Sequence, residues 1–245
     1  INLAQAPFYE TNLDTFLSEA SENLIATSDF ELAIKNTDIS IIIVPTPSNS
    51  NGAFSNKYVI NALKSLCLHL KKSEKDYHLF IISSTVSPGS IENELIPIIE
   101  NNSDRSINRG VGLSYVPDFV RLGNVINDFR NPDLLLIGET DVKSGKLTES
   151  LYSKMTVGSP EILHTSIINA ELIKISLNFY LTMKISFANT IANISQKIPG
   201  ANTDLITKAL SADKRINGKY LRCALAFGGA SCPRNTQAIK SIYKK

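Results

Sequence analysis

The chain has 245 residues, of which 43% are hydrophobic and 20% charged, and its formal net charge is +2. There is no basic excess and no apolar run of the ~20 residues that span a membrane, so we expect neither nucleic acid nor a membrane as a partner. Three cysteines without a CxxC spacing (Cys67, Cys223 and Cys232) exclude a disulfide framework and a zinc site, which favours a reducing cytoplasm and no metal.

The first elements in the chain have the pattern of a helix followed by a strand. Residues 27–37 predict a short helix, with Ser28 or Asp29 as its N-cap. Residues 38–44 form a β-branched apolar run that Pro45 ends. Such a run is typical of a buried strand in a parallel sheet. The chain begins with Ile1 rather than Met, so we expect it to be part of a longer protein.

The same alternation continues along the chain. A loop at 46–56, rich in Ser, Asn, Gly and Pro, precedes a helical apolar stripe at 58–71. A second apolar strand at 78–83 leads into the polar loop 84–89. Residues 91–100 then predict a second long helix.

Two further strands complete the pattern, at 111–116 and 134–137. Strands that alternate with helices predict an α/β fold with a parallel, Rossmann-like sheet, which we assign to residues 1–165. Ligands of such sheets bind beyond the carboxyl ends of the strands. Chemistry is therefore expected in the loops that begin at Pro45, Ser84 and Pro117.

The remaining residues, 166–245, have a different texture and predict a helical domain. Residues 167–196 contain no Gly or Pro and predict one helix of about 45 Å. Its apolar residues cover much of the circumference, so we expect it to pack against another subunit, as in a homodimer, or against the neighbouring domain. Asn202 or Thr203 is placed to cap a short helix, and residues 218–235 predict a loop.

Seven segments in order carry a resemblance to a known family. They are PFYETNLDTFL (7–17), VPTP (44–47), SSTVSPGS (83–90), YVPDFVRLGN (115–124), ELIKISLNFYLTMKISFAN (171–189), DKRINGKYL (213–221) and AFGGASCPRN (226–235). Together they resemble the UDP-glucose/GDP-mannose dehydrogenases. The GxGxxG unit and the C-terminal domain of that family have no counterpart in the sequence.

The resemblance implies an NAD-dependent oxidation of a nucleotide sugar at C6 to a uronic acid. A cysteine thiolate that forms a thiohemiacetal and then a thioester is the family's nucleophile. In the ungapped register Ser231 occupies that position, and a shift of one residue places Cys232 there; both remain candidates. Asn235 stands where the family has Asp, and keeps hydrogen bonding without the charge.

Four other residues are implied to take part in the chemistry. Lys174 and Asn178 are spaced i, i+4 on the long helix, so they share one face and are placed to hold an oxyanion and a water. Asp118 replaces the family's Glu as the carboxylate that activates water or transfers a proton. Thr85 is implied to order the same water through its hydroxyl.

The resemblance also implies two sets of binding residues. The cofactor set is Val44, Pro45, Thr46, Pro47, Ser84, Thr85 and Arg234. The substrate set is Phe119, Val120, Arg121, Lys174, Asn178, Arg215, Tyr220, Phe227, Gly228 and Gly229. Leu122 replaces a family Glu, which removes a polar group, and the guanidinium of Arg215 suits the phosphates of the nucleotide.

Two other functions remain open from the sequence. A β-hydroxyacid or 6-phosphogluconate-type dehydrogenase also uses Lys and Asn one helical turn apart, but it requires neither the VPTP segment nor the FGG-S-C loop. A non-catalytic relative that binds a nucleotide sugar or a partner subunit is favoured by the altered positions Ser231, Leu122 and Asn235. Failure of NAD to raise the melting temperature would support the second.

Overall fold

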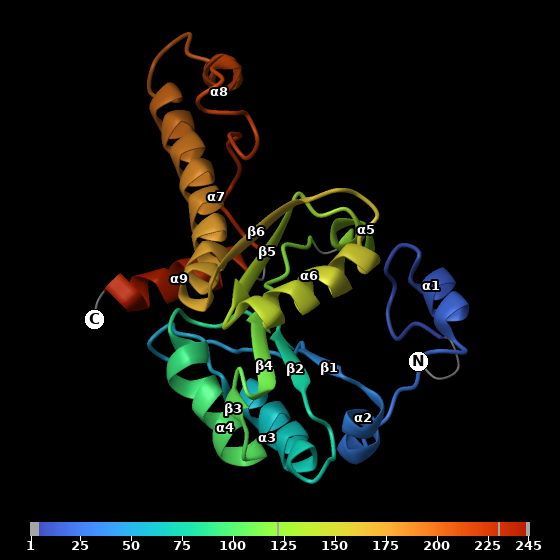
Figure 1. Cartoon of the computed structure of the whole chain (residues 1–245). Helices are drawn as coiled ribbons and strands as arrows, with labels where there is room; N and C mark the ends of the chain where they lie inside the picture. Colours follow the sequence, from blue (N-terminus) through green and yellow to red (C-terminus); the bar gives the residue numbers. More distant parts are fainter. Residues whose placement is uncertain (1–4, 122, 230, 244–245) are drawn as a thin grey trace. The chain divides into compact units, whose positions relative to one another are not determined.

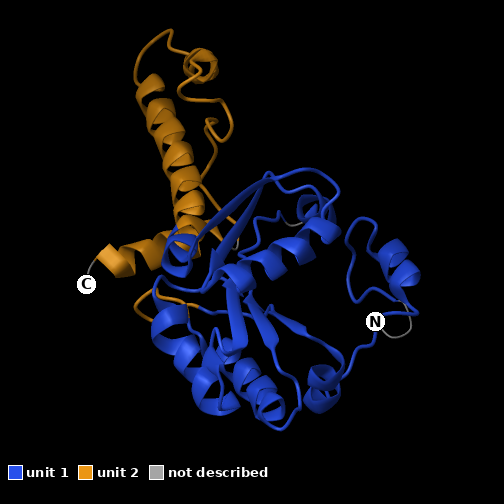
Figure 2. Cartoon of the chain, in the orientation of Figure 1, with its two compact units in different colours: residues 1–47, 55–172 blue, residues 48–54, 173–245 orange. Residues whose placement is uncertain are grey.

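The structure is a computed structural model, and it describes residues 5–121, 123–229 and 231–243 (Figure 1). The contacts divide the chain into two compact units (Figure 2). Unit 1 comprises Ile1–Pro47 and Ser55–Leu172, and unit 2 comprises Ser48–Phe54 and Ile173–Lys245. The loop after the first strand therefore belongs to the same unit as the C-terminal helices.

A mostly parallel sheet forms the centre of unit 1. Its strands lie in the order β1 (Ile39–Ile42), β2 (His78–Ile82), β4 (Gly110–Tyr115), β5 (Leu134–Glu139) and β6 (Glu161–Ser166), and β3 (Ser106–Ile107) pairs with β4. The predicted α/β fold is confirmed. The exception to the predicted parallel pairing is β5, which runs antiparallel to β4. The chain leaves β4 and enters β5 at the same edge of the sheet, because the 18 residues between them make no crossover.

Besides the start of the long C-terminal helix, seven helices and helical turns belong to unit 1 among its described residues. They are α1 (Leu13–Ala20), α2 (Phe30–Asn36), α3 (Lys57–Lys71), η1 (Ile91–Leu95), α4 (Ile96–Ser103), α5 (Val125–Arg130) and α6 (Val142–Met155). Asp29 caps α2 by accepting hydrogen bonds from the backbone N–H groups of Glu31 and Leu32, as one of the two predicted caps. The predicted helix at 91–100 exists, but its first turn, η1, is π-helical.

The core of unit 1 lies on both faces of β2. Leu79 and Ile81 pack with Ile137 of β5 and Tyr152 of α6. Successive side chains of a strand point to opposite faces, so Phe80 points to the other face, where it is also fully buried. All five residues of β2 are buried for this reason.

The prediction that the first strand is buried is wrong in part. Within β1, Ile39 to Ile41 are only half-buried, and Ile43 just beyond the strand is 66% exposed. The cause is that β1 is the last strand in the sheet order and pairs only with β2 among the described strands.

The described residues of unit 2 form three helices. They are α7 (Ile167–Ser195), whose first six residues belong to unit 1, α8 (Thr203–Ala212) and α9 (Cys232–Tyr243). The predicted long helix and the Asn202 cap of α8 are confirmed. The predicted loop at 218–235 is wrong at its end, because α9 already begins at Cys232. Pro233 suits that first turn, where a missing N–H leaves no hydrogen bond unmade.

Candidate functional site

The carboxyl ends of β1, β2 and β4 are held together by two serines. Ser84 Oγ donates to the carbonyl of Val44 and accepts from its N–H, both at 2.8 Å. Ser83 Oγ donates to the carbonyl of Val116 at 2.7 Å. Of the predicted cofactor residues, the structure thus brings Val44 and Ser84 into direct contact. Thr46, two residues after Val44, is buried, whereas Pro45 and Pro47 are exposed.

The segment after β2 carries Thr85, which is half-buried. It continues into a turn in which the N–H of Ser90 donates to the carbonyl of Ser87 at 2.9 Å. The side chain of Glu171, in α7, accepts hydrogen bonds from the backbone N–H groups of Gly89 and Ile91 at 2.6 and 3.0 Å. Glu171 is completely buried and was not among the predicted site residues.

The segment after β4 contains an ion pair that the sequence did not predict. Arg121 donates through Nε and Nη2 to the two carboxylate oxygens of Asp128, at 2.9 and 2.6 Å. These bonds hold the pKa of Asp128 well below its usual range, at about 2. Phe119 is half-buried and Val120 exposed. Leu122 lies outside the described residues.

Asp118 lies near two tyrosines whose hydroxyls are buried. Burial is the main cause that raises the pKa of Tyr115 and Tyr152, and the charge of Asp118 raises both further. Asp118 itself is half-buried. A carboxylate at this position is accessible to a ligand while its surroundings are partly dry.

Lys174 and Asn178 lie one turn apart on α7, and both are half-buried. The backbone carbonyl of Asn178 accepts a hydrogen bond from Thr182 Oγ1 at 2.8 Å, and the side-chain amide of Asn178 takes no part in this bond. Both residues belong to unit 2, whereas Thr85 and Asp118 belong to unit 1. The predicted catalytic residues are therefore distributed over the two units.

Arg215 lies on an exposed loop of unit 2. Its guanidinium donates to both carboxylate oxygens of Asp213, at 2.6 Å for the closest contact. Lys184 of α7 holds this loop by donating to the carbonyls of Ile216 and Asn217, at 3.3 and 2.8 Å. The contact with Asp213 orients the fork of Arg215 and raises its pKa.

A second loop of unit 2 contains the remaining predicted substrate residues. Tyr220 has a φ of +64° and is 47% exposed. Phe227 is half-buried. No atom lies within 4 Å of a Cβ added to Gly228 or Gly229, so neither glycine is required by a close approach of the chain's described residues. Asn189 of α7 fixes this loop by accepting from the N–H of Ala224 at 2.8 Å.

The start of α9 presents both candidate nucleophiles. Ser231 is exposed and Cys232, the first residue of the helix, is half-buried. Asn235 is 3% exposed, and both its backbone N–H and its Nδ2 donate to the carbonyl of Ser231 at 2.9 Å. Its Oδ1 is buried with no hydrogen-bond partner among the described residues. Asn235 therefore fixes the backbone that precedes Cys232.

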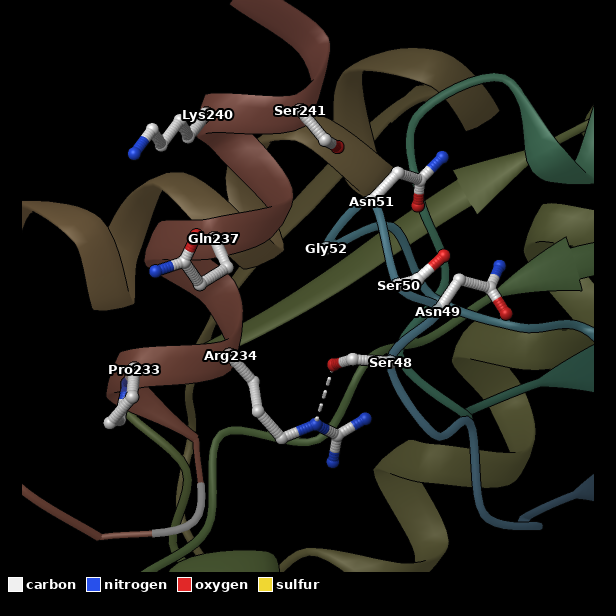
Figure 3. A pocket seen from close by; sticks show the side chains of 10 residues that line it. All are labelled: Ser48, Asn49, Ser50, Asn51, Gly52, Pro233, Arg234, Gln237, Lys240 and Ser241. Carbon is white, nitrogen blue, oxygen red and sulfur yellow. Dashed lines mark hydrogen bonds between the residues drawn. The ribbon is translucent and has the colours of Figure 1, made fainter.

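A pocket of ≈ 620 Å³ lies within unit 2, between the loop after β1 and α9 (Figure 3). Arg234 Nε donates to Ser48 Oγ at 3.3 Å, and the guanidinium lies 5.1 Å from the centre of the Phe54 ring. Loop and helix are close at Gly52, where a Cβ would lie 3.0 Å from the carbonyl oxygen of Gln237. The lining is Ser48, Asn49, Ser50, Asn51, Gly52, Pro233, Arg234, Gln237, Lys240 and Ser241. It contains two cations and no carboxylate.

Comparison with protein families identifies the chain in two parts. Residues 1–156 match the NAD binding domain of the UDP-glucose/GDP-mannose dehydrogenase family, and residues 168–245 match its central domain. The chain belongs to the UDP-glucose/GDP-mannose dehydrogenase family. The predicted family is confirmed, and the predicted cofactor agrees with the NAD binding domain that the first match describes.

Individual relatives of this dehydrogenase family support the same conclusion. The chain is 35% identical to a UDP-glucose 6-dehydrogenase of Rickettsia bellii and 32% identical to a GDP-mannose 6-dehydrogenase of Pseudomonas putida, over 100% and 98% of its length. It covers 54% of each relative, so the chain spans about half the length of the curated relatives it matches.

Solved structures of family members share the fold. A UDP-glucose dehydrogenase from Pyrobaculum islandicum superimposes with a TM-score of 0.90 at 27% identity, over 99% of this chain and 55% of that one. A GDP-mannose dehydrogenase from Pseudomonas aeruginosa gives a TM-score of 0.81 at 29% identity, over 99% and 55%.

Three residues that organise the site were missed from the sequence. Glu171, Lys184 and Asn189 all lie in the segment 171–189, which carried the family resemblance. The available signal was that each is a polar side chain in a helix that is otherwise largely apolar. Their partners are backbone groups distant in sequence, which no local pattern reveals.

Further absences can be stated for the described part of the chain. None of its helices is long and apolar enough to cross a membrane. Within the same residues, no group of three His, Cys, Asp or Glu side chains is placed to hold a metal ion.

Proposed function

We propose that the protein to which this chain belongs oxidises a nucleotide sugar of the UDP-glucose type at C6 to the uronic acid. The observation that carries the proposal is the match of both the NAD-binding and the central domain of the family, in order. The half-buried Cys232 at the start of α9 supports it, since the negative charge of a thiolate is favoured at a helix N-terminus.

NAD would bind at the carboxyl ends of β1 and β2. The contact of Ser84 with Val44 leaves the segments 44–47 and 84–85 adjacent at that edge, which is where nucleotides bind to parallel sheets. Arg234, the other residue proposed for the cofactor, belongs to unit 2 and is proposed from family position alone. When bound, NAD supplies the acceptor for the hydrides that leave C6.

Cys232 is the proposed nucleophile. The C6 hydroxyl would first lose its proton to solvent and C6 a hydride to NAD, which leaves the C6 aldehyde. The Cys232 thiolate adds to this aldehyde and forms an S–C bond, and loss of a second hydride to NAD from the thiohemiacetal gives a thioester. Water then adds to the thioester, the C–S bond breaks, and the acid and the free thiolate are released. Ser231, the alternative nucleophile, is less suited because a serine hydroxyl is scarcely ionised without a dedicated base.

The remaining catalytic roles are proposed from family position. The ammonium of Lys174 and the amide of Asn178 would stabilise the oxyanion on C6. Asp118 and Thr85 would orient the attacking water. Asn235 would act indirectly, since it fixes the carbonyl of Ser231 next to Cys232.

Substrate binding would require a change of partner at two arginines. Arg121 and Arg215 are paired with Asp128 and Asp213, so each has a carboxylate that a substrate phosphate or carboxylate would replace or share. The other proposed substrate residues are Phe119, Val120, Tyr220, Phe227, Gly228 and Gly229. Glycine at 228 and 229 would allow a sugar to approach the backbone.

The domain boundary, the dimer and the location are also proposals. We place the NAD domain at 1–165 and the helical domain at 166–245, in a cytoplasmic homodimer formed through residues 167–196. Large apolar side chains on α7 are exposed, which favours a partner over this helix. They are Leu177, Phe179, Tyr180, Met183, Phe187 and Ile194.

The decisive experiment is NADH release by the full-length protein with UDP-glucose and GDP-mannose. Two NADH per acid are expected from wild type, and Cys232→Ser is expected to lower the rate by about 10³-fold or more. Ser231→Ala and the exposed-cysteine control Cys223→Ser are expected to change it less than about threefold. If Ser231→Ala abolishes release and Cys232→Ser does not, Ser231 is the nucleophile.

Two other results would reject the proposal itself. Full activity without both Ser231 and Cys232 would indicate a dehydrogenase that uses no covalent intermediate. Tight binding of a nucleotide sugar without NADH release, in a protein whose melting temperature NAD does not change, would indicate a binding protein.

A further inference from the structure

A buried carboxylate joins the start of α7 to the turn that follows Thr85. Glu171 is 0% exposed, and its two oxygens accept from the N–H groups of Gly89 and Ile91 at 2.6 and 3.0 Å. A buried charge is costly unless it is hydrogen-bonded, and both oxygens of this one have a backbone donor. The contact is therefore strong and short, and it is made inside unit 1.

The turn that Glu171 binds is itself closed by hydrogen bonds. The N–H of Ser90 donates to the carbonyl of Ser87 at 2.9 Å, and the N–H and Nδ2 of Asn93 donate to the carbonyl of Gly89 at 3.0 and 2.8 Å. Gly89 has a φ of +85°, which other residues rarely adopt. Residues 87–93 therefore act as one rigid segment.

Thr85 lies between two fixed points. Ser84, the residue before it, is hydrogen-bonded to Val44. Only Val86, which is completely buried, separates it from the rigid segment that begins at Ser87. Glu171 holds Gly89 and Ile91, so its contact fixes the turn to which the short stretch with Thr85 leads.

We propose that Glu171 is a positioning residue, which holds the turn after Thr85 and thereby the Thr85 hydroxyl. The inference rests on the proposed function, because it assumes that Thr85 takes part in the reaction. Glu171 is not assigned a contact with substrate or cofactor. Its role is to fix where the Thr85 hydroxyl lies within unit 1.

The charge of Glu171 provides a signature of this role. Burial, above all, raises its pKa to about 7, the charge of Glu92 on η1 adds to this, and the two N–H donors oppose it. The hydroxyl of Tyr115 on β4 is also close enough for the charge of Glu171 to raise its pKa, and Lys174 is one turn further along α7. A protonated Glu171 accepts less well from Gly89 and Ile91, so the anchor weakens as the pH falls through about 7.

The test compares Glu171→Gln with the control Glu92→Gln, which removes an exposed carboxylate from the adjoining turn. In the full-length enzyme, Glu171→Gln is expected to lower kcat about 10- to 100-fold and to change the KM values less than about threefold, because misplacement by ~1 Å costs about that much. The inflection of kcat near pH 7 is expected to disappear. Glu92→Gln should leave kcat and the KM values unchanged above the inflection and keep the inflection, moved to slightly lower pH because the charge of Glu92 adds to the raised pKa of Glu171.

Amide hydrogen exchange tests the anchor without any catalysis. The amides of Gly89 and Ile91 are expected to exchange about tenfold faster or more in Glu171→Gln, and at the wild-type rate in Glu92→Gln. If wild type releases no NADH, the proposed function fails while the exchange result still stands. If exchange quickens but kcat and its pH profile match wild type, the positioning role is overturned. Glu171→Asp, which keeps the charge, replaces Glu171→Gln if that variant does not fold, with a smaller kcat loss expected.

Discussion

Strand β2 and helix α7 place their apolar residues in opposite environments. All five residues of β2 are buried between elements of unit 1. Along the part of α7 in unit 2, by contrast, Phe179, Met183 and Phe187 are 40%, 52% and 46% exposed. The sheet therefore completes its own core, whereas the helix has apolar surface left for a partner. Both elements carry residues for which a catalytic role is proposed, Thr85 just beyond the strand and Lys174 on the helix.

The largest expected change in the free energy of unfolding comes from a substitution in strand β2. Phe80→Ala removes a completely buried ring and should lower the free energy of unfolding by about 3–5 kcal/mol. Phe187→Ala, the matched change on α7, should lower it by less than about 1 kcal/mol at concentrations where the chain is monomeric. Urea unfolding followed by circular dichroism measures both values. Equal decreases in the free energy of unfolding would show that β2 and α7 do not differ in how far their apolar side chains are buried.

A pH titration distinguishes the strand from the helix by the sign of its slope. Burial, above all, lowers the pKa of His78 on β2 to about 4, below the 6.5 of the unfolded state. The unfolded chain therefore binds a proton first, and the free energy of unfolding should fall by up to about 3 kcal/mol between pH 6.5 and 4. His78→Gln should remove that loss.

Glu171 on α7 is expected to change the free energy of unfolding with pH in the opposite direction, and it serves as the comparison. Its pKa is raised to about 7 in the fold, so the folded state binds the proton first and stability should fall as pH rises from about 4.5 to 7. Glu171→Gln should remove this second slope and leave that of His78. Urea midpoints at half-unit pH steps measure both, and a His78→Gln protein that still loses stability below pH 6.5 contradicts the assignment.

The exposed face of α7 can be tested by adding a charge to it. Phe187→Glu places a carboxylate in the proposed dimer contact and should weaken dimerisation about 10- to 100-fold, because the charge would be desolvated there. Lys208→Glu on α8, an exposed position, is the control. Sedimentation equilibrium gives the two dissociation constants. If the wild-type chain and the full-length protein are both monomeric at all concentrations, the proposed dimer contact is ruled out.

The sequence predicted the elements better than their pairing. The apolar stripe of α3 and the run of β2 depend on local spacing, and both were found in place. The direction of β5 was missed, because antiparallel pairing with β4 depends on the path of the connection between them. The start of α9 at Cys232 was also missed, since Pro233 breaks a helix everywhere except in its first turn.

The site was predicted as a set of positions but not as a set of contacts. Motif order was sufficient to select Arg121, Arg215 and Asn235. It gave no indication that Asp128 holds the first arginine, or that Asn235 is buried against the carbonyl of Ser231. Glu171 was overlooked for the same reason, because its donors lie about 80 residues earlier in the chain and become neighbours only in the fold.

The smallest expected change in the free energy of unfolding concerns the ion pair of Arg121 and Asp128. Its arginine is exposed to solvent, whereas its carboxylate is largely buried. The pKa of Asp128 is held at about 2, so the stability that its charge contributes is present above about pH 3.8 and is lost as the pH falls through 2. Asp128→Asn should lower the free energy of unfolding at pH 7 by about 1 kcal/mol, since 69% of the Arg121 side chain is exposed and water screens the pair.

The same variant tests whether this pair limits substrate binding. Removal of the carboxylate removes one anion that competes with the ligand for Arg121, so the affinity of the full-length protein for a nucleotide sugar should rise about two- to fivefold by isothermal titration calorimetry. Asp213→Asn, which frees Arg215 in unit 2, is the matched variant. Weaker binding in Asp128→Asn would mean that the carboxylate orients Arg121 for the ligand instead of competing with it, and the same comparison in Asp213→Asn decides this for Arg215.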